Sequence, residues 1–176
     1  MRRLSLLALA CAGLMMAQSP KYGVGQAAGA EDIRRLGISV GPDGEGLPAG
    51  SGTAVAGKAV YASKCAGCHG SKGEGATAAA LVGGKGTLNT AKPVKTVGSY
   101  WPYATTLWDY INRAMPYYQP ETLSATEVYS VSAYVLYLNG IVGETQAMDA
   151  KSLPKVKMPN RDGFVADPRP DVKGAR

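Results

Sequence analysis

Apolar residues recur at helical spacing in three segments of the chain, and this pattern predicts an all-α body. The first segment, residues 53–65, begins at Thr53, whose hydroxyl can cap a helix, and runs into a pair of cysteines. The second segment, residues 105–114, ends shortly before Pro116, which stops a helix. Its apolar side consists of Leu107, Trp108 and Ile111.

The third segment has the clearest boundaries. It begins at Ser124, and Glu127 follows three residues later, so the two side chains can form a reciprocal capping box. The pair Asn139-Gly140 is typical of a helix end. Four apolar residues at helical spacing form the stripe that we expect to be buried: Val128, Val131, Val135 and Leu138. We find no strand pattern and no internal repeat in the sequence.

Two stretches rich in glycine and proline flank the helical body. The predicted organisation is a leader at 1–17, an extended arm at 18–52, a body at 53–140 and an irregular tail at 141–176. Within the first arm, residues 31–36 are compatible with a short helix. Because long segments without regular structure are uncommon, we expect the arms to wrap either the body or a partner.

The first seventeen residues, MRRLSLLALACAGLMMA, have the form of a secretory signal. Two arginines precede an uncharged apolar run that ends in small residues and is too short to span a bilayer. Cleavage is expected after Ala17, with 28–30 as the second choice, while the residues before Cys11 are a poor match to a lipoprotein signal. No later run is apolar enough to cross a membrane, so we expect an exported, periplasmic protein without membrane insertion.

Charge is distributed unevenly along the chain. Removal of the leader takes away two arginines, so the formal net charge falls from +6 to +4. Residues 53–99 contain one acid, Glu74, and residues 100–150 contain five acids against Arg113. The lysines of the first of these stretches are Lys58, Lys64, Lys72, Lys85, Lys92 and Lys95. They form either a basic face that steers an acidic partner or an ordinary solvated surface. Without an arginine cluster, and with an export signal, we expect no binding to nucleic acid.

The stretch KCAGCHG carries the chemistry of the chain. A thioredoxin-type pair would follow a strand and begin a helix, whereas Cys65 and Cys68 come after a helix. A zinc site would need a fourth ligand, and the chain without its leader has no other cysteine or histidine. The pattern C-x-x-C-H is the attachment sequence of a c-type haem. We therefore expect one haem c, bound covalently through both cysteines, with His69 as an axial ligand of its iron.

A low-spin electron carrier needs a second axial ligand, and methionine sulfur is the natural candidate in a chain with one histidine. Met115 lies at the end of a predicted helix and ahead of a proline that turns the chain. The separation from His69 leaves room for the chain to reach the other face of the haem. Met148 lies in a polar stretch and Met158 outside the helical body, so Met115 is the preferred ligand.

Tyr100 and Trp101 are candidates for contacts with a haem propionate, because each combines a ring with a polar tip. Ordinary core packing is the alternative, and Lys95 could also pair with a propionate. With both axial positions filled by protein, the chain should transfer single electrons and have no catalytic site of its own. A haem enzyme or gas sensor would instead require an open iron site, which means that Met115 would not bind the iron.

The body, about residues 53–140, resembles class I cytochrome c in its helix leading into C-x-x-C-H, its methionine-proline on a central loop and its capped last helix. In that family a glycine and an aromatic residue precede the first cysteine by eight and four positions and lie where the terminal helices cross. Gly57 and Tyr61 hold those positions here, facing Tyr134 and Leu138. The resemblance implies a small class I cytochrome c fold with extended arms.

One departure from that family concerns the histidine. The family often has a proline about a dozen residues after it, whose carbonyl accepts the imidazole N–H. This chain has ALVG at residues 80–83 instead. Because any backbone carbonyl can accept that hydrogen bond, we expect the orientation of the histidine to be kept.

A narrower resemblance runs through nearly the whole chain after the leader. The stretches SPKYGVG, PDGEGLPAGSGTA, KPVKTVGSYWPYATTLWDYINRAMPY, AYVLYLNGIVGE and LPKVKMPNRDGF are similar to cytochrome subunits of bacterial sulfite dehydrogenases and to the first haem domain of the sulfane dehydrogenase cytochrome subunit. This resemblance implies a heterodimer in which a subunit with a molybdenum cofactor oxidises the sulfur compound. The chain would pass the electrons to a soluble cytochrome c.

The single C-x-x-C-H and the end of the sequence at Arg176 favour the sulfite dehydrogenase subunit over the sulfane dehydrogenase component. The two arms are then the expected partner surface, with Arg161 and Asp162 as candidate polar contacts, and self-wrapping is the alternative. A free periplasmic electron shuttle remains open as well. It would use the same haem body, would have no need of long arms and should be a monomer.

Overall fold

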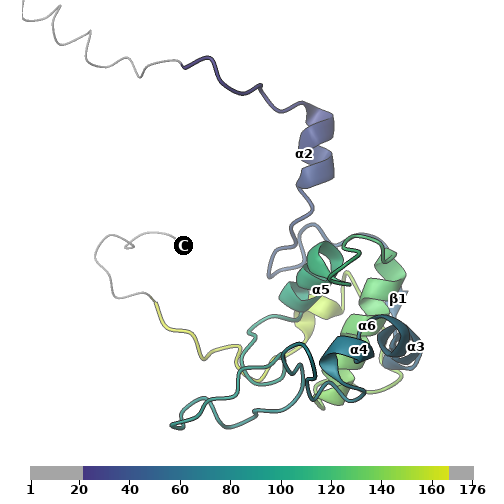
Figure 1. Ribbon diagram of the computed structural model, residues 1–176, viewed down its shortest axis with the longest axis vertical. Helices are drawn as coiled ribbons and strands as arrows, with labels where there is room; N and C mark the ends of the chain where they lie inside the picture. The colour runs from purple at the N-terminus through teal and green to yellow at the C-terminus, as the bar shows by residue number, and fades with distance from the viewer. Residues whose placement is uncertain (1–21, 167–176) are drawn as a thin grey trace, which may run out of the picture. The chain divides into compact units, whose positions relative to one another are not determined.

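The computed structural model describes residues 22–166, and the predicted leader 1–17 with its cleavage after Ala17 lies outside the described residues. Residues 22–37 and 38–166 form separate units. Figure 1 labels α2 (Ala30–Leu36), β1 (Ser51–Gly52), α3 (Ala54–Lys64), α4 (Ala66–His69), α5 (Ala104–Ala114) and α6 (Ala125–Leu138), which β2 (Met148–Asp149) and a 3-10 turn, η1 (Leu153–Lys155), follow. The three helices expected from the apolar pattern are α3, α5 and α6, so the all-α prediction is confirmed.

Side chains cap these helices where the sequence indicated. Thr53 Oγ1 accepts a hydrogen bond from the Ala56 N–H at 3.3 Å and begins α3. At the start of α6, Glu127 Oε2 accepts from the Ser124 N–H at 2.8 Å, and the Ser124 hydroxyl accepts from the Glu127 N–H at 3.3 Å. Because the first N–H groups of a helix lack partners within it, this reciprocal pair fixes the residue at which α6 begins.

Helices α3 and α6 cross closely at Gly57. A Cβ atom at Gly57 would overlap the Ser130 carbonyl group and would lie 2.9 Å from the Cβ of Tyr134. One turn further along α3, the rings of Tyr61 and Tyr134 pack with their centroids 5.2 Å apart. The expected meeting of Gly57 and Tyr61 with Tyr134 is present, and Ser130 is a partner that the sequence did not indicate.

Helix α6 is buried on all sides. Its residues from Val128 to Leu136 are all buried, whereas the sequence pattern predicted one buried stripe. The last residue of that stripe, Leu138, is only half-buried. The other side is covered by the arm that precedes α3, where the Tyr129 hydroxyl donates to the Pro48 carbonyl at 2.9 Å. Tyr129 also packs against Trp108 of α5, with ring centroids 5.5 Å apart. The burial of α6 on all sides from Val128 to Leu136 requires such cover, and the arm provides it.

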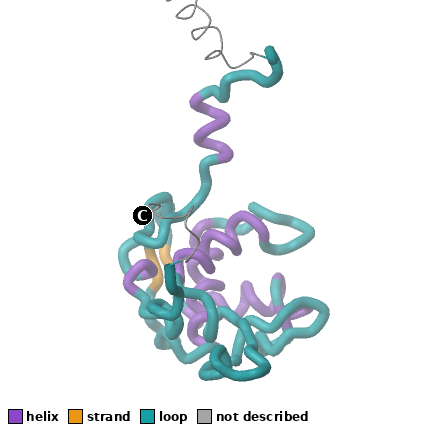
Figure 2. Tube along the Cα trace, turned by 90° about the vertical axis from the view of Figure 1, so that its left-hand side faces the viewer, coloured by secondary structure: helices purple, strands orange, loops and turns teal. Residues whose placement is uncertain are grey.

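The arm and the tail pair with each other through a two-stranded antiparallel ladder. Ser51 of β1 lies opposite Asp149 of β2, and Gly52 lies opposite Met148. Figure 2 shows the two short strands side by side at one edge of the body. The expectation of no strand was wrong here, because two residues per strand are too few to produce an alternating pattern in the sequence.

The tail belongs to the core as far as Met158. Met148 and Leu153 are fully buried, and Val156 and Met158 are also buried. The prediction that Met158 lies outside the body was wrong, since its side chain is 3% exposed within the core cluster. On the other side of the body, Asp109 of α5 accepts a hydrogen bond from the Val40 N–H at 2.9 Å. Residues 38–52 and 141–158 therefore wrap the body itself.

Residues 22–37 form the other unit and contain α2, the short helix expected in the arm. None of its residues is buried, and the apolar side chains of Ile33 and Leu36 are exposed. Its charged residues pair along the helix, Glu31 with Arg34 and Asp32 with Arg35. A seven-residue helix is only marginally stable in water without packing.

The close crossing of α3 and α6 predicts the effect of a single methyl group. Gly57→Ala should lower the free energy of unfolding by about 1–3 kcal/mol, because the new Cβ forces the two helices apart. Gly143→Ala is the matched control, since a Cβ there would meet only Gln146 at 3.9 Å, and it should change stability by less than about 0.5 kcal/mol. Denaturant titration of the holo-protein measures both, and equal effects would contradict the crossing as described.

The cap of α6 predicts a pH dependence. Hydrogen bonds from the Ser124 side chain, and then from its backbone, hold the pKa of Glu127 below its ordinary value of 4.5. A carboxyl group whose pKa is lower in the folded state stabilises the fold above the unfolded pKa, and that contribution is lost as the pH falls through the folded pKa. Glu127→Gln should therefore cost about 0.5 kcal/mol at pH 7 and flatten the loss of stability below pH 4.5. Glu144→Gln, in an exposed loop, is the matched control and should change stability at pH 7 by less than about 0.5 kcal/mol.

Candidate haem-binding site

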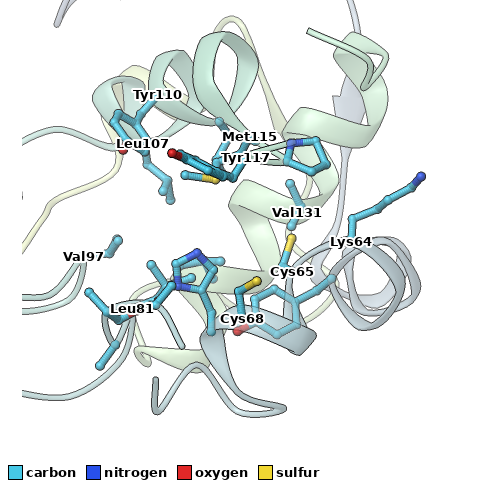
Figure 3. Close-up of a pocket in the computed structure, with 18 of the residues that line it drawn as sticks. Lys64, Cys65, Cys68, Leu81, Val97, Leu107, Tyr110, Met115, Tyr117 and Val131 are labelled. Atoms are coloured by element: carbon cyan, nitrogen blue, oxygen red, sulfur yellow. Dashed lines mark hydrogen bonds between the residues drawn. The ribbon is translucent and has the colours of Figure 1, made fainter. Parts of the chain in front are cut away.

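A cavity of about 600 Å³ separates the cysteine motif from the end of α5. Figure 3 shows Met115 and Tyr117 across this cavity from Cys68 and Leu81. The wall between them is mostly aliphatic, formed by Leu81, Val97, Leu107, Ile111, Val131 and Val135. The cavity therefore suits a flat, largely apolar group whose two faces can be ligated by side chains from opposite walls.

The motif folds as a single helical turn that follows α3. Cys65 is the C-cap of α3, and α4 follows from Ala66 to His69. The N–H groups of Cys68 and His69 both donate to the Cys65 carbonyl, at 3.1 Å and 3.0 Å. This turn brings both sulfurs and the imidazole to one wall of the cavity, and all three side chains line it.

A backbone carbonyl orients the histidine. The distance from His69 Nδ1 to the Ala79 oxygen is 2.8 Å. With the proton placed on Nδ1, that nitrogen donates to Ala79, and Nε2 keeps its lone pair for a metal. The expected carbonyl is present, one residue before the 80–83 stretch. The Ala78 N–H donates to Cys68 O at 2.9 Å and holds this loop against the motif.

The pKa of Cys65 differs in direction from that of the reactive cysteine in a redox pair. Burial, with a smaller contribution from the neighbouring Cys68, raises the pKa of Cys65 to about 11. Redox-active C-x-x-C pairs lower the pKa of one thiol so that the thiolate can attack, and Cys65 shows the opposite shift. The free thiol of Cys65 is therefore neutral at pH 7.

Tyr61 lines the cavity next to the cysteines and supports the end of the motif. Its hydroxyl donates to the Gly70 carbonyl at 2.9 Å, directly after α4. Burial, as the largest cause, raises the pKa of Tyr61 to about 12. Tyr61 thus stays neutral and acts as a fixed hydrogen-bond donor that stabilises the turn.

Met115 is the methionine, among residues 22–166, that lines the cavity. It ends α5, and its N–H donates to the Ile111 carbonyl at 3.0 Å before the chain turns into an extended conformation. Met148 and Met158 are core residues and do not line the cavity. The structure therefore brings Met115 opposite the histidine motif and does not bring the other two there.

The two aromatic candidates for propionate contacts have different surroundings. Trp101 lines the cavity, and its ring packs edge-on against Tyr110 of α5 with centroids 5.8 Å apart. Tyr100 is not a lining residue, and its ring lies against Phe164, 5.3 Å away. Lys95 lines the cavity with its amine 5.1 Å from the centre of the Tyr100 ring.

Sequence reasoning missed three aromatic residues of the cavity, Tyr110, Tyr117 and Tyr118. Tyr110 follows Leu107 by three residues on α5, so helical spacing alone could have placed it near the same face. Tyr117 and Tyr118 follow Met115 and Pro116, and the path of the chain beyond a proline has no comparable spacing rule. Both side chains are largely exposed at the cavity mouth.

The residues of this cavity fit a c-type haem. Two thiols and an oriented imidazole lie on one wall, a thioether lies on the other, and the lining between them is apolar. These are the donors that attach and ligate haem in cytochromes c.

Comparison with known proteins agrees with this chemistry. Residues 52–135 match the family model described as cytochrome c oxidase, cbb3-type, subunit III. One chain of the sulfane dehydrogenase SoxCD from Paracoccus pantotrophus is similar with 41% sequence identity and a TM-score of 0.78, over 88% of this chain and 76% of that chain. Among residues 22–166, no helix is both long and apolar enough to cross a membrane. The chain therefore belongs to the cytochrome c family, as a monohaem electron-transfer cytochrome with covalently bound haem c.

Proposed function

We propose that the chain is the electron-transfer subunit of a periplasmic dehydrogenase that oxidises a sulfur compound. A molybdenum-containing catalytic subunit would supply the electrons, and a soluble cytochrome c would receive them. The similarity to a chain of sulfane dehydrogenase SoxCD carries this proposal. That similarity covers 88% of the chain, whereas the haem body at 53–140 is only half of it, so it extends into the arms.

The haem assignment within this proposal is specific. Cys65 and Cys68 would form the two thioether bonds, and His69 and Met115 would supply the nitrogen and sulfur ligands of the iron. Bound haem supplies a one-electron redox centre. The Ala79 carbonyl keeps the imidazole oriented, and the aliphatic walls keep water away. Trp101, which lines the cavity, would contact the haem edge.

The sulfur compound would be oxidised on the partner subunit, and two candidate substrates are considered. With sulfite, the partner would combine sulfite and water to give sulfate, two protons and two electrons, and the electrons would leave one at a time through this haem. The sequence resemblance favours sulfite. The SoxCD similarity gives sulfane sulfur as the second candidate, because that protein is a sulfane dehydrogenase.

The packing of the arms narrows the surface available to a partner. Residues 38–52 and 141–158 wrap the body, so they are largely committed to self-contact. Residues 22–37 have no buried side chain and expose Ile33 and Leu36. We infer that this unit, rather than the whole of both arms, contributes most to partner binding. Export would remove the leader at 1–17 first.

The assignment of Met115 can be tested by spectroscopy of the ferric cytochrome. Met115→Ala should abolish the sulfur-to-iron charge-transfer band and lower the reduction potential, since axial ligands set haem potentials over a range of roughly 0.8 V. Met158→Leu, a core substitution of similar volume, should keep the band and cost less than about 1.5 kcal/mol of stability. A band that survives in the Met115 variant would mean that another methionine binds the iron and would contradict the assignment. A wild-type protein without the band would reopen the iron site to substrates or gases.

The proposed partner can be tested by purifying the tagged chain from its own periplasm. A molybdenum-containing subunit should co-purify, and sulfite should reduce the haem of that complex. The purified chain alone is the control, and sulfite should leave it oxidised, which excludes direct chemical reduction. Reduction by a sulfane sulfur compound but not by sulfite would move the assignment to the sulfane dehydrogenase component. A monomer reduced by neither would identify a free electron shuttle.

A further inference from the structure

The end of the tail holds a loop of the haem cavity in place. We call residues 158–164 the tail clasp; they are MPNRDGF, the last seven residues of the stretch LPKVKMPNRDGF, and the haem chemistry has no use for them. Met158 anchors the clasp in the core. From there the Asn160 side-chain amide donates a hydrogen bond of 2.7 Å to the Tyr100 carbonyl.

Two further contacts join the clasp to the same loop. The Arg161 guanidinium lies over the Tyr103 ring, 4.3 Å from its centre. The Phe164 ring packs edge-on against Tyr100 with centroids 5.3 Å apart. Tyr103 is the residue that precedes α5, so the clasp contacts both ends of the short segment between Tyr100 and the helix.

Trp101 lies between those two ends and lines the cavity. The Tyr100 carbonyl belongs to the peptide unit that leads into Trp101, so a hydrogen bond to it restricts the rotation of that peptide. On the N-terminal side of Tyr100, its own N–H donates to the Thr96 carbonyl at 3.0 Å. The peptide units on both sides of Tyr100 are thus fixed, one by the preceding turn and one by Asn160.

We propose that Asn160 is a positioning residue for the haem, which acts by holding Trp101 against the cavity. A wall that stays closed keeps water from the haem, and burial is one of the means by which a protein sets a haem potential. Ferric haem carries one more positive charge than ferrous haem, so water that enters stabilises the ferric state. A looser Trp101 therefore lowers the reduction potential. The proposal deepens the assigned electron-transfer role and depends only on haem binding in this cavity, and not on the partner or the sulfur substrate.

The reduction potential of the purified full-length holo-cytochrome tests this role. Asn160→Ala removes the donor without changing charge, and it should shift the potential to more negative values while the methionine-to-iron band remains. Val156→Ala is the matched control, because it removes buried volume from the same tail at a residue that does not line the cavity. Both variants should lower the thermal midpoint, but only Asn160→Ala should shift the potential. A folded Asn160→Ala protein with the wild-type potential would overturn the proposal.

A double-mutant comparison shows whether Asn160 acts through Trp101. Trp101→Ala alone should lower the potential, and adding Asn160→Ala to it should change the potential no further. A second shift of full size in that background would mean that Asn160 acts independently of Trp101, which contradicts the proposed role.

A second variant keeps the test available if Asn160→Ala does not fold. Phe164 is 52% exposed, so Phe164→Ala should fold, and it removes the ring contact to Tyr100. We expect a smaller shift in the same direction, and no shift in this variant would count against the clasp. Absence of the methionine-to-iron band from the wild-type protein would instead indicate that the assignment of Met115 as the iron ligand is wrong.

Discussion

The crossing of α3 and α6 at Gly57 is the contact on which the haem site depends. Helix α3 ends in the cysteine motif, so the position of both sulfurs and of His69 follows from the angle and distance at which α3 leaves α6. The absence of a side chain at Gly57 permits the backbones to approach, and Tyr61 then packs on Tyr134 while its hydroxyl supports Gly70. The helix crossing at Gly57 thereby determines the position of the cavity wall that carries the cysteine motif, two helical turns further along the chain.

A second constraint is the small size of the core. Three helices of 11 to 14 residues enclose little apolar volume, and a small domain of this kind needs additional support. Two sources provide it here. The haem would fill the cavity between the motif and Met115, and the wrapped parts of the arms cover the side of α6 that faces away from that cavity, through Pro48 and the residues around Met148.

Local chemistry made much of this structure predictable. The caps at Thr53 and Ser124, the end of α6 and the C-x-x-C-H motif depend on neighbours within a few residues, and such signals are visible in one sequence. The sequence predicted that a backbone carbonyl would accept the hydrogen bond from His69, but it did not identify Ala79. That carbonyl lies in a glycine-rich loop, and loops have no regular spacing from which its position could be predicted. Met158 was misplaced because its burial depends on packing between segments that are far apart in the sequence. The all-round burial of α6 was missed for the same reason.

That ladder has a consequence for how the molecule loosens. Cooperative units in proteins open together when they share their contacts, and β1 and β2 are each other's only ladder partners within residues 22–166. Release of the arm near Ser51 therefore also frees the start of the tail that leads to Asn160. The arm before α3 and the start of the tail are therefore expected to loosen together, while Leu153 and Met158 still hold the rest of the tail in the core.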